Sequence, residues 1–171
     1  IGGGLVVDGQ VFHGATPGES EIGHVRLDPS GTVVEKRCSG WAVDRKIREA
    51  IASEPDGILA KLVGNEDRAE ARFLLAAIEK GDATAQCLFD KTMDELSFAL
   101  SHVVHLLHPD MIVLGGGLSL LGESLRAAVA GRLPDLIMEV MRPGPEIALA
   151  RLSEDAVPVG ALLLAAEMHP H

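Results

Sequence analysis

Cysteine is scarce in this sequence, with only Cys38 and Cys87 among 171 residues. Two cysteines are too few for a disulfide framework, and their spacing matches no paired-cysteine zinc motif. We therefore expect both to be small, buried thiols. This argues against the disulfide-stapled and zinc-cluster classes of protein.

Long hydrophobic runs are also missing. No apolar stretch reaches the roughly 18–20 residues that a membrane span needs, and residues 162–166 fall far short of it. Residues 1–7 have neither the basic segment nor the cleavage site of a secretory signal. We therefore expect a cytoplasmic protein in a reducing compartment, with no membrane partner.

Basic residues are fewer than acidic ones. The chain has 15 Lys and Arg against 25 Asp and Glu, which gives a net charge of −10. Binding to nucleic-acid phosphates needs clustered Lys and Arg. We therefore expect no nucleic-acid partner for this part of the protein, while the excess of carboxylates mainly favours solubility.

Familiar catalytic signatures are absent too. The sequence has no H-E-x-x-H metal motif and no recognisable nucleophile–base pair. Its glycine triplet, Gly115–Gly117, fits neither the dinucleotide pattern G-x-G-x-x-G nor the phosphate loop G-x-x-x-x-G-K-[ST]. The residues alone indicate a ligand-binding domain and do not specify a reaction.

What is present is a succession of short strands and helices. With 47% hydrophobic residues, the chain can bury one core. Asp8-Gly9 between apolar pairs predicts a tight hairpin, and the apolar run 111–114 predicts a strand covered on both faces. Periodicity predicts helices over 41–51, 58–63, 67–80, 83–107, 120–130 and 158–168, and strands over 32–34 and 147–152. This pattern indicates an α/β fold, a mixed β-sheet with packed helices.

The glycine triplet is the first candidate site. Three glycines at the exit of strand 111–114 let the backbone approach a ligand closely, because no Cβ intervenes. A helix starting there would add a modest positive potential. The carboxyl ends of strands are also where ligands bind in open α/β folds. On spacing alone, a simple strand-to-helix turn is an equal alternative.

The second candidate site is the segment Glu21-Ile22-Gly23-His24. A carboxylate and an imidazole suit the hydroxyls of a polyol, and on a strand a bulge or turn at Gly23 would bring Glu21 and His24 together. Exposed polar positions beside a loop are the alternative. Glu35 is likewise either a ligand-binding carboxylate or one member of a surface charge run.

Two further features are interpreted without a ligand. His102, His105 and His108 lie three residues apart, and we interpret them as a polar or half-buried stripe because no carboxylate or cysteine partners accompany them. Trp41 is interpreted as core packing rather than as a platform on which a sugar stacks.

Taken in order, these blocks resemble the C-terminal lobe of a ROK-family sugar kinase or repressor. Gly14-Ala15, Glu21-Ile22-Gly23-His24 and Asp28-Pro29 are similar to the family's G-A…G-E-I-G-H…D-P stretch. Residues 108–117 are similar to its N-P-x-x-I-V-I-G-G-G segment, and residues 155–161 to its closing D-x-x-x-x-G-A. The resemblance implies an actin/hexokinase-like (ribonuclease H-like) fold, with residues 1–171 as the C-terminal lobe and an N-terminal lobe expected upstream.

The resemblance also implies which residues bind ligands. The general-base aspartate and the first phosphate loop are expected upstream, so it places no catalytic residue in this chain, and we expect residues 1–171 alone to be inactive. ATP and Mg²⁺ are the implied cofactors. The implied sugar ligands are Glu21, His24 and Glu35; Gly115, Gly116 and Gly117 would line the adenosine side of ATP, and Gly2, Gly3 and Gly4 would end a glycine turn that contacts phosphate.

The sequence departs from the family at its zinc loop. The C-x-C-G-x-x-G-C-x-E loop has no counterpart between His24 and Glu35, and Val33 takes the place of its last cysteine. Cys38 stands where the family tends to have Ala. His24 thus keeps a possible sugar role and loses its family role as a zinc ligand, so we expect no metal. Packing and the shortened turn at residues 28–31 must order this loop instead.

The expected activity of the intact protein is transfer of the γ-phosphoryl group of ATP to a hydroxyl of a hexose or N-acetylhexosamine. Two alternatives are a sugar-sensing ROK repressor with an upstream DNA-binding head and a sugar-binding lobe that has lost catalysis. Loss of the zinc cysteines favours an unusual kinase over the repressor. Contacts from Glu21, His24 and Glu35 would fit glucose, mannose and their 2-acetamido forms equally well. We also expect a homodimer formed through the region of residues 83–107, and self-association of exposed apolar surface where another lobe would pack.

Overall fold

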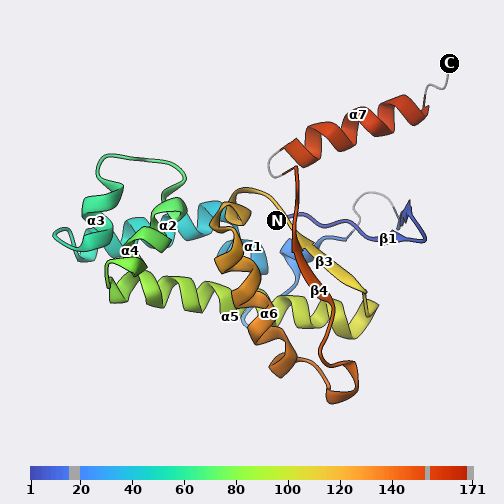
Figure 1. Ribbon diagram of the computed structural model, residues 1–171, viewed down its shortest axis with the longest axis horizontal. Coiled ribbons are helices and arrows are strands. Elements are labelled where there is room, and N and C mark those ends of the chain that lie inside the picture. Colours follow the sequence, from blue (N-terminus) through green and yellow to red (C-terminus); the bar gives the residue numbers. More distant parts are fainter. Residues whose placement is uncertain (16–19, 153–154, 169–171) are drawn as a thin grey trace.

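The computed structural model describes residues 1–15, 20–152 and 155–168, which form helices and two small, separate sheets (Figure 1). The strands are β1 (Val6–Val7), β2 (Gln10–Val11), β3 (Met111–Leu114) and β4 (Glu146–Leu149). The α-helices are α1 (Val34–Cys38), α2 (Gly40–Ser53), α3 (Ile58–Val63), α4 (Leu74–Glu79), α5 (Ala83–Leu107), α6 (Glu123–Leu136) and α7 (Ala156–Met168). Short 3₁₀ helices are η1 (Ile22–His24), η2 (Glu70–Phe73), η3 (Gly117–Leu121) and η4 (Glu139–Met141).

The two sheets differ in direction. β1 and β2 form an antiparallel hairpin, as predicted, because Asp8 and Gly9 adopt the positive φ angles of 52° and 75° that a tight hairpin turn needs. β3 and β4 run parallel, with Ile112 opposite Ile147. Parallel strands need a crossover between them, and α6 lies within that connection.

The long helix α5 joins two hydrophobic clusters. From Phe89 to Val104 it packs against α6 and the β3–β4 pair, and near its start it packs against α2, α3 and α4. Ile78 and Leu118 are half-buried and touch both clusters, so the clusters form a continuous interior. The fully buried side chains at its centre include Ile47, Leu74, Met93, Val104, Leu125, Val129 and Leu133.

The sequence predicts most of these elements. Helices 58–63 and 83–107 are confirmed to the residue, and Ser39 begins α2 as expected, accepting a hydrogen bond on Oγ from the Ala42 N–H at 3.2 Å. The prediction for 67–80 is right only for residues 74–79, which form α4; Ala69 adopts a left-handed conformation with φ of 56°, and the residues that follow it form the 3₁₀ helix η2. The predicted strand 32–34 is also wrong, since Val34 begins α1.

Two expectations around the glycine triplet need correction. β3 is not covered on both faces, because Met111 and Val113 are 47% and 56% exposed. The element that follows Gly116 is not an α-helix but the five-residue η3, and α6 begins only at Glu123. A helix dipole at the triplet therefore does not contribute as expected.

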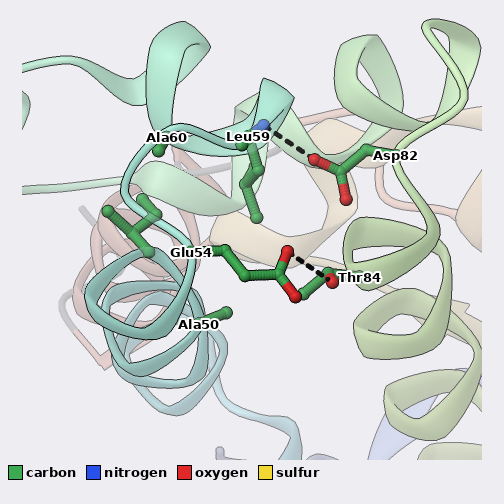
Figure 2. Close-up of a pocket in the computed structure, with 8 residues that line it drawn as sticks. Ala50, Glu54, Leu59, Ala60, Asp82 and Thr84 are labelled. Atoms are coloured by element: carbon green, nitrogen blue, oxygen red, sulfur yellow. Dashed lines mark hydrogen bonds between the residues drawn. The ribbon is translucent and has the colours of Figure 1, made fainter.

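The Asp82 side chain caps the N-terminal ends of two helices. Asp82 is 8% exposed; its Oδ1 accepts a hydrogen bond from the Ala85 N–H at 2.8 Å, and its Oδ2 accepts one from the Leu59 N–H at 2.7 Å. The first bond caps α5 and the second caps α3. Figure 2 shows the bond from Leu59 to Asp82 beside the bond from Thr84 Oγ1 to Glu54 Oε2. The hollow between them has a volume of only about 10 Å³, which suits no organic ligand.

The helix α7 extends away from the rest of the molecule (Figure 1). Its leucines Leu162, Leu163 and Leu164 are all more than half exposed. Within the described ranges, no helix is both long and apolar enough to cross a membrane. Of the two cysteines, Cys38 is buried as expected, whereas Cys87 is exposed, contrary to expectation.

Candidate functional site

Glu35 lies on the short helix α1, which is firmly anchored. On its inner side Val34 and Cys38 are buried. Arg37 donates through Nε to Oε1 of Glu95 on α5 at 2.7 Å. Lys46 of α2 donates to the other oxygen of Glu95 at 3.1 Å. Because one carboxylate holds cations from two helices, α1 is fixed against both α2 and α5.

The Glu35 carboxylate lies beside the first residue of the sequence. Its Oε2 lies 3.3 Å from the ammonium nitrogen of Ile1. A hydrogen bond from this ammonium group and its charge hold the pKa of Glu35 below its usual value, and the Trp41 side chain and His24 lower it further. The 3₁₀ helix η1, which carries His24, packs against α1, so His24 and Glu35 lie on neighbouring elements.

The segment Glu21–His24 is a turn and not a strand. Residues 22–24 form η1, and the Glu21 carbonyl accepts a hydrogen bond from the His24 N–H at 3.0 Å. Gly23 is buried, and a Cβ at this position would collide with the carbonyl oxygen of Ile1. A Cβ on Gly3 would come within 2.6 Å of the Ser20 carbonyl oxygen. Close backbone contact between residues 1–4 and 20–23 therefore requires glycine at both positions.

The roles expected of Gly2, Gly3 and Gly4 remain predictions. The structure places Gly3 beside the Glu21–His24 segment, and Gly2 and Gly4 are exposed in extended chain. A Cβ on either Gly2 or Gly4 would meet no atom within 4 Å.

Hydrogen bonds order the loop between His24 and Glu35. Arg26 and Val33 form a β-bridge, and the Leu27 N–H donates to the Thr32 carbonyl at 2.8 Å. Inside this turn, Oδ1 of Asp28 accepts from the Ser30 hydroxyl and from the Thr32 N–H. The hydroxyl bonds from Ser30 and Thr32 lower the pKa of Asp28 to about 2.

The loop gives a pH-dependent prediction. The pKa of Asp28 falls from 3.8 to about 2 on folding, so its contribution to stability is complete above pH 4 and is lost as the pH falls toward 2. Asp28→Asn should therefore lower Tm at pH 7, and its difference from wild type should shrink below about pH 4. Thermal unfolding followed by circular dichroism across this pH range measures both effects.

Asp56→Asn is the matched control, because Asp56 lies in an exposed turn. Its Tm should follow wild type at every pH. A chelator should leave the wild-type Tm unchanged, since the loop is ordered by its own hydrogen bonds. A constant Tm difference between Asp28→Asn and wild type over the whole pH range would contradict the linkage to Asp28.

The last residue of the glycine triplet borders a hollow that is larger than the one beside Asp82. Gly115 leaves β3, and a Cβ there would lie 3.1 Å from that of Ala150. Gly116 has a φ of 79°, and its carbonyl accepts from the N–H and hydroxyl of Ser119 at 2.9 and 2.7 Å. Gly117 then lines a cavity of about 170 Å³. The other lining residues are Gly40, Trp41, Asp44, Ala69, Ala71, Arg72, Leu120 and Leu121.

This cavity is small, mainly apolar and rigidly framed. It is below the roughly 300–1,000 Å³ of sites for drug-sized ligands, so it suits one ring system rather than a whole nucleotide. Asp44 of α2 accepts hydrogen bonds from the Ala69 and Ala71 N–H groups at 3.2 and 2.9 Å. Arg48 binds the fully buried Glu70 at 2.5 Å. These contacts fix the wall formed by η2.

The residues that form this wall carry little signal in the sequence. Trp41 is 49% exposed and lines the cavity, so its interpretation as a core residue is wrong. Asp44 and Arg72 stand in ordinary helical patterns, and their sequence context carries no signal of a site. The only available signal was Trp41, a large aromatic residue directly after Ser39-Gly40 in a chain with 3% aromatics.

The histidine stripe forms no metal site. Nε2 of His105 accepts a hydrogen bond from the Met138 N–H at 3.1 Å, and His102 packs edge-on against Phe98. His108 ends α5 in a left-handed conformation. Among residues 1–15, 20–152 and 155–168, no group of three or more His, Cys, Asp or Glu side chains is placed to hold a metal ion.

Comparison with known proteins decides the family. The profile of the ROK family matches residues 1–168. The chain belongs to the ROK family. This result confirms the resemblance drawn from the glycine triplet and the Glu21–His24 segment.

Its ROK relatives include named sugar kinases. A glucokinase from Thermotoga maritima is 31% identical over 169 residues, which cover 94% of this chain and 53% of the glucokinase. An N-acetyl-D-glucosamine kinase from Escherichia fergusonii is 28% identical over 174 residues, covering 96% of this chain and 55% of that kinase. The chain therefore spans about half the length of the curated relatives it matches.

A solved structure confirms the fold. The ROK-family glucokinase from Streptomyces griseus, determined in complex with glucose and AMPPNP, matches with a TM-score of 0.79 and 25% sequence identity. The match covers 95% of this chain and 56% of the glucokinase. The expected actin/hexokinase-like α/β fold is thereby confirmed.

Proposed function

We propose that residues 1–171 are the C-terminal lobe of an ATP-dependent sugar kinase that phosphorylates a hexose or N-acetylhexosamine. The observation that carries this proposal is the cavity that joins the last glycine of the triplet, Gly117, to Gly40 and Trp41 at the start of α2. The helix α1, which carries Glu35, leads directly into this start of α2. The sugar-kinase names among the relatives support the same reading of the site.

In this proposal Glu35, His24 and Glu21 orient the sugar. An ionised carboxylate accepts hydrogen bonds from two sugar hydroxyls, and an imidazole donates to or accepts from a third. Charge-assisted bonds of this kind fix the ring in one orientation, which lets a single hydroxyl face the phosphoryl donor. Because the ordinary pKa of a glutamate side chain is roughly 4.3, the Glu35 carboxylate is ionised throughout the neutral range.

The nucleotide occupies the cavity and the glycine triplet. The adenine ring fits the apolar space between Trp41 and Leu120, while Gly115–Gly117 allow the chain to pass close to the adenosine. Mg²⁺ would arrive with ATP and supply charge neutralisation for phosphoryl transfer. The general-base aspartate belongs to a second lobe, which would close over both substrates. Phosphoryl transfer therefore needs both lobes, and residues 1–171 alone are inactive.

Assembly and location follow the same proposal. We propose a homodimer formed through the C-terminal part of α5, a region where Phe98, Leu106 and Leu107 are exposed. The proposed location is the cytoplasm, where ATP and free sugars are available. No nucleic-acid partner is proposed for this lobe, whose net charge is −10.

The decisive experiment measures ADP release from Mg-ATP by the longer protein that carries this lobe, against hexoses and N-acetylhexosamines. Turnover on one sugar would support the kinase and identify its substrate. Sugar binding without turnover on any sugar would overturn the kinase proposal and favour a sugar-responsive regulator. Residues 1–171 alone should release no ADP, and activity in this chain would contradict the need for a second lobe.

A further inference from the structure

The 3₁₀ helix η2 begins at a strained residue that lines the cavity of about 170 Å³. Ala69 has a φ of 56° and a ψ of 35°, which places it in the left-handed region. This region is unfavourable for a residue that carries a Cβ, because the Cβ comes too close to the following carbonyl oxygen. Such conformations persist only where the surrounding structure holds them. A contact from another part of the chain must therefore hold Ala69.

Asp44 of α2 provides that contact. Its Oδ2 accepts a hydrogen bond from the Ala69 N–H at 3.2 Å, and its Oδ1 accepts one from the Ala71 N–H at 2.9 Å. Both donors lie at the start of η2, where the cap position is an alanine with no polar side chain to bind them. Asp44 thus does, from 25 positions away, what a capping side chain ordinarily does from within the segment.

Asp44 also lines the cavity itself, so one side chain joins two of the cavity walls. The wall from α2 consists of Gly40, Trp41 and Asp44, and the wall from η2 consists of Ala69, Ala71 and Arg72. The start of α2 is fixed by its own cap, Ser39. The separation of the two walls therefore depends on the pair of hydrogen bonds that Asp44 accepts.

A second contact joins the same two elements but acts elsewhere. Arg48, one turn further along α2, forms an ion pair with the buried Glu70 at 2.5 Å. Neither of these two residues lines the cavity. The ion pair therefore keeps η2 attached to α2, whereas Asp44 restrains the backbone at the edge of the cavity.

We propose that Asp44 is a positioning residue for the base of the nucleotide. It holds Ala69 in the left-handed conformation and so keeps the η2 wall at the separation from α2 that a flat ring requires. This inference rests on the proposed function, because it assumes that a nucleotide base occupies the cavity. Both oxygens of Asp44 already accept an N–H from the wall, so its part is to shape the cavity rather than to bind the base.

The separation of the walls matters because dispersion contacts are short-ranged. A gap of about 0.5–1 Å between a ring and a wall forfeits roughly a quarter to a half of the attraction of each contact. The cavity is mainly apolar, so such contacts make up most of what it offers a base. If Ala69 returned to the right-handed region, the wall would move and these contacts would weaken.

The test is a cycle of variants in which Mg-AMPPNP is titrated into the 171-residue chain by calorimetry. Asp44→Ala should weaken AMPPNP binding about fivefold to thirtyfold, the factor by which an alanine disfavours the left-handed region. Ala69→Gly should bind within about twofold of wild type, because glycine adopts a positive φ without that cost. Asp44→Ala combined with Ala69→Gly should recover most of the lost affinity, since the glycine adopts the required φ without being held.

Controls separate this role from general stability. Glu49→Ala removes an exposed carboxylate from the same helix and should retain wild-type affinity for AMPPNP. Asp44→Asn keeps one acceptor oxygen, so an intermediate loss is expected, and it replaces Asp44→Ala in the cycle if circular dichroism shows that the alanine variant does not fold. Affinity for glucose or N-acetylglucosamine should be unchanged in all of these variants.

Three results would overturn the role of Asp44 while the proposed function stands. The first is wild-type affinity for AMPPNP in Asp44→Ala. The second is a loss that Ala69→Gly does not restore, because Asp44 would then act other than through the backbone at Ala69. The third is an equal loss of sugar affinity, which a general loss of structure would produce. If AMPPNP does not bind the wild-type chain, the proposed nucleotide site of this lobe fails, and the inference fails with it.

Discussion

Replacing Glu35 with Ala should weaken binding of the preferred sugar by a factor of about 100 or more. A hydrogen bond to a charged group contributes about 1.5–3 kcal/mol, so each lost bond lowers affinity about 10- to 150-fold. Glu35 sits on a helix anchored by the bond between Arg37 and Glu95, so the backbone that carries its carboxylate is fixed. Calorimetry with glucose and N-acetylglucosamine measures the loss.

The Glu35 series includes its own controls. Glu35→Gln retains the size of the side chain and one acceptor oxygen, so it should weaken sugar binding less than Glu35→Ala does. Glu79→Gln removes an exposed carboxylate near the end of α4 and should leave the sugar affinity unchanged. Affinity for AMPPNP measured without sugar should be close to wild type in all three variants. Wild-type sugar affinity in Glu35→Ala would remove this residue from the site.

Asp82→Ala should lower the free energy of unfolding by about 3–5 kcal/mol, through loss of two helix caps and exposure of two buried N–H groups without partners. This is the largest effect on stability that we expect from a polar residue of this chain. The reason is that one nearly buried carboxylate caps α5 through Ala85 and caps α3 through Leu59, the second bond being drawn in Figure 2. Urea unfolding followed by circular dichroism gives the difference.

Asp82→Asn distinguishes the two bonds. Its amide has one acceptor oxygen, so it can serve the N–H of Leu59 or that of Ala85 but not both, and an intermediate loss is expected. Asp56→Ala, in the exposed turn before α3, should change stability by no more than about 0.5 kcal/mol. Equal stabilities for Asp82→Ala and Asp56→Ala would show that the shared cap contributes nothing.

The sequence predicts features that arise from local chemistry. Asp8-Gly9 predicts the hairpin because both turn positions accept positive φ, and the periodic apolar residues of 83–107 predict α5 with its bounds. Glu35 could be selected as a candidate because it precedes Ser39-Gly40, in the order in which the family's blocks follow one another along the chain. These features depend on residues close together in sequence, so a single sequence is enough to identify them.

Features that depend on distant residues could not be predicted. The contact from Asp82 to Leu59 spans 23 positions, and the cavity wall joins Trp41 to residues 69–72 and to Gly117. Ala69 adopts its left-handed conformation while its N–H and that of Ala71 are bonded to Asp44, a tertiary constraint that helical periodicity does not report. The exposed face of β3 has a similar origin, because a continuous apolar run does not reveal which face is covered.

The length of α5 has a mechanical consequence. Its 25 residues extend over about 37 Å and link the cluster near α2–α4 to the cluster around α6. The helix α1, which carries Glu35, is bonded to α5 through Arg37 and Glu95. The helix α2, which carries part of the cavity wall, is bonded to the same Glu95 through Lys46. The proposed sugar-binding carboxylate and the cavity are therefore held at a fixed separation by one continuous helix.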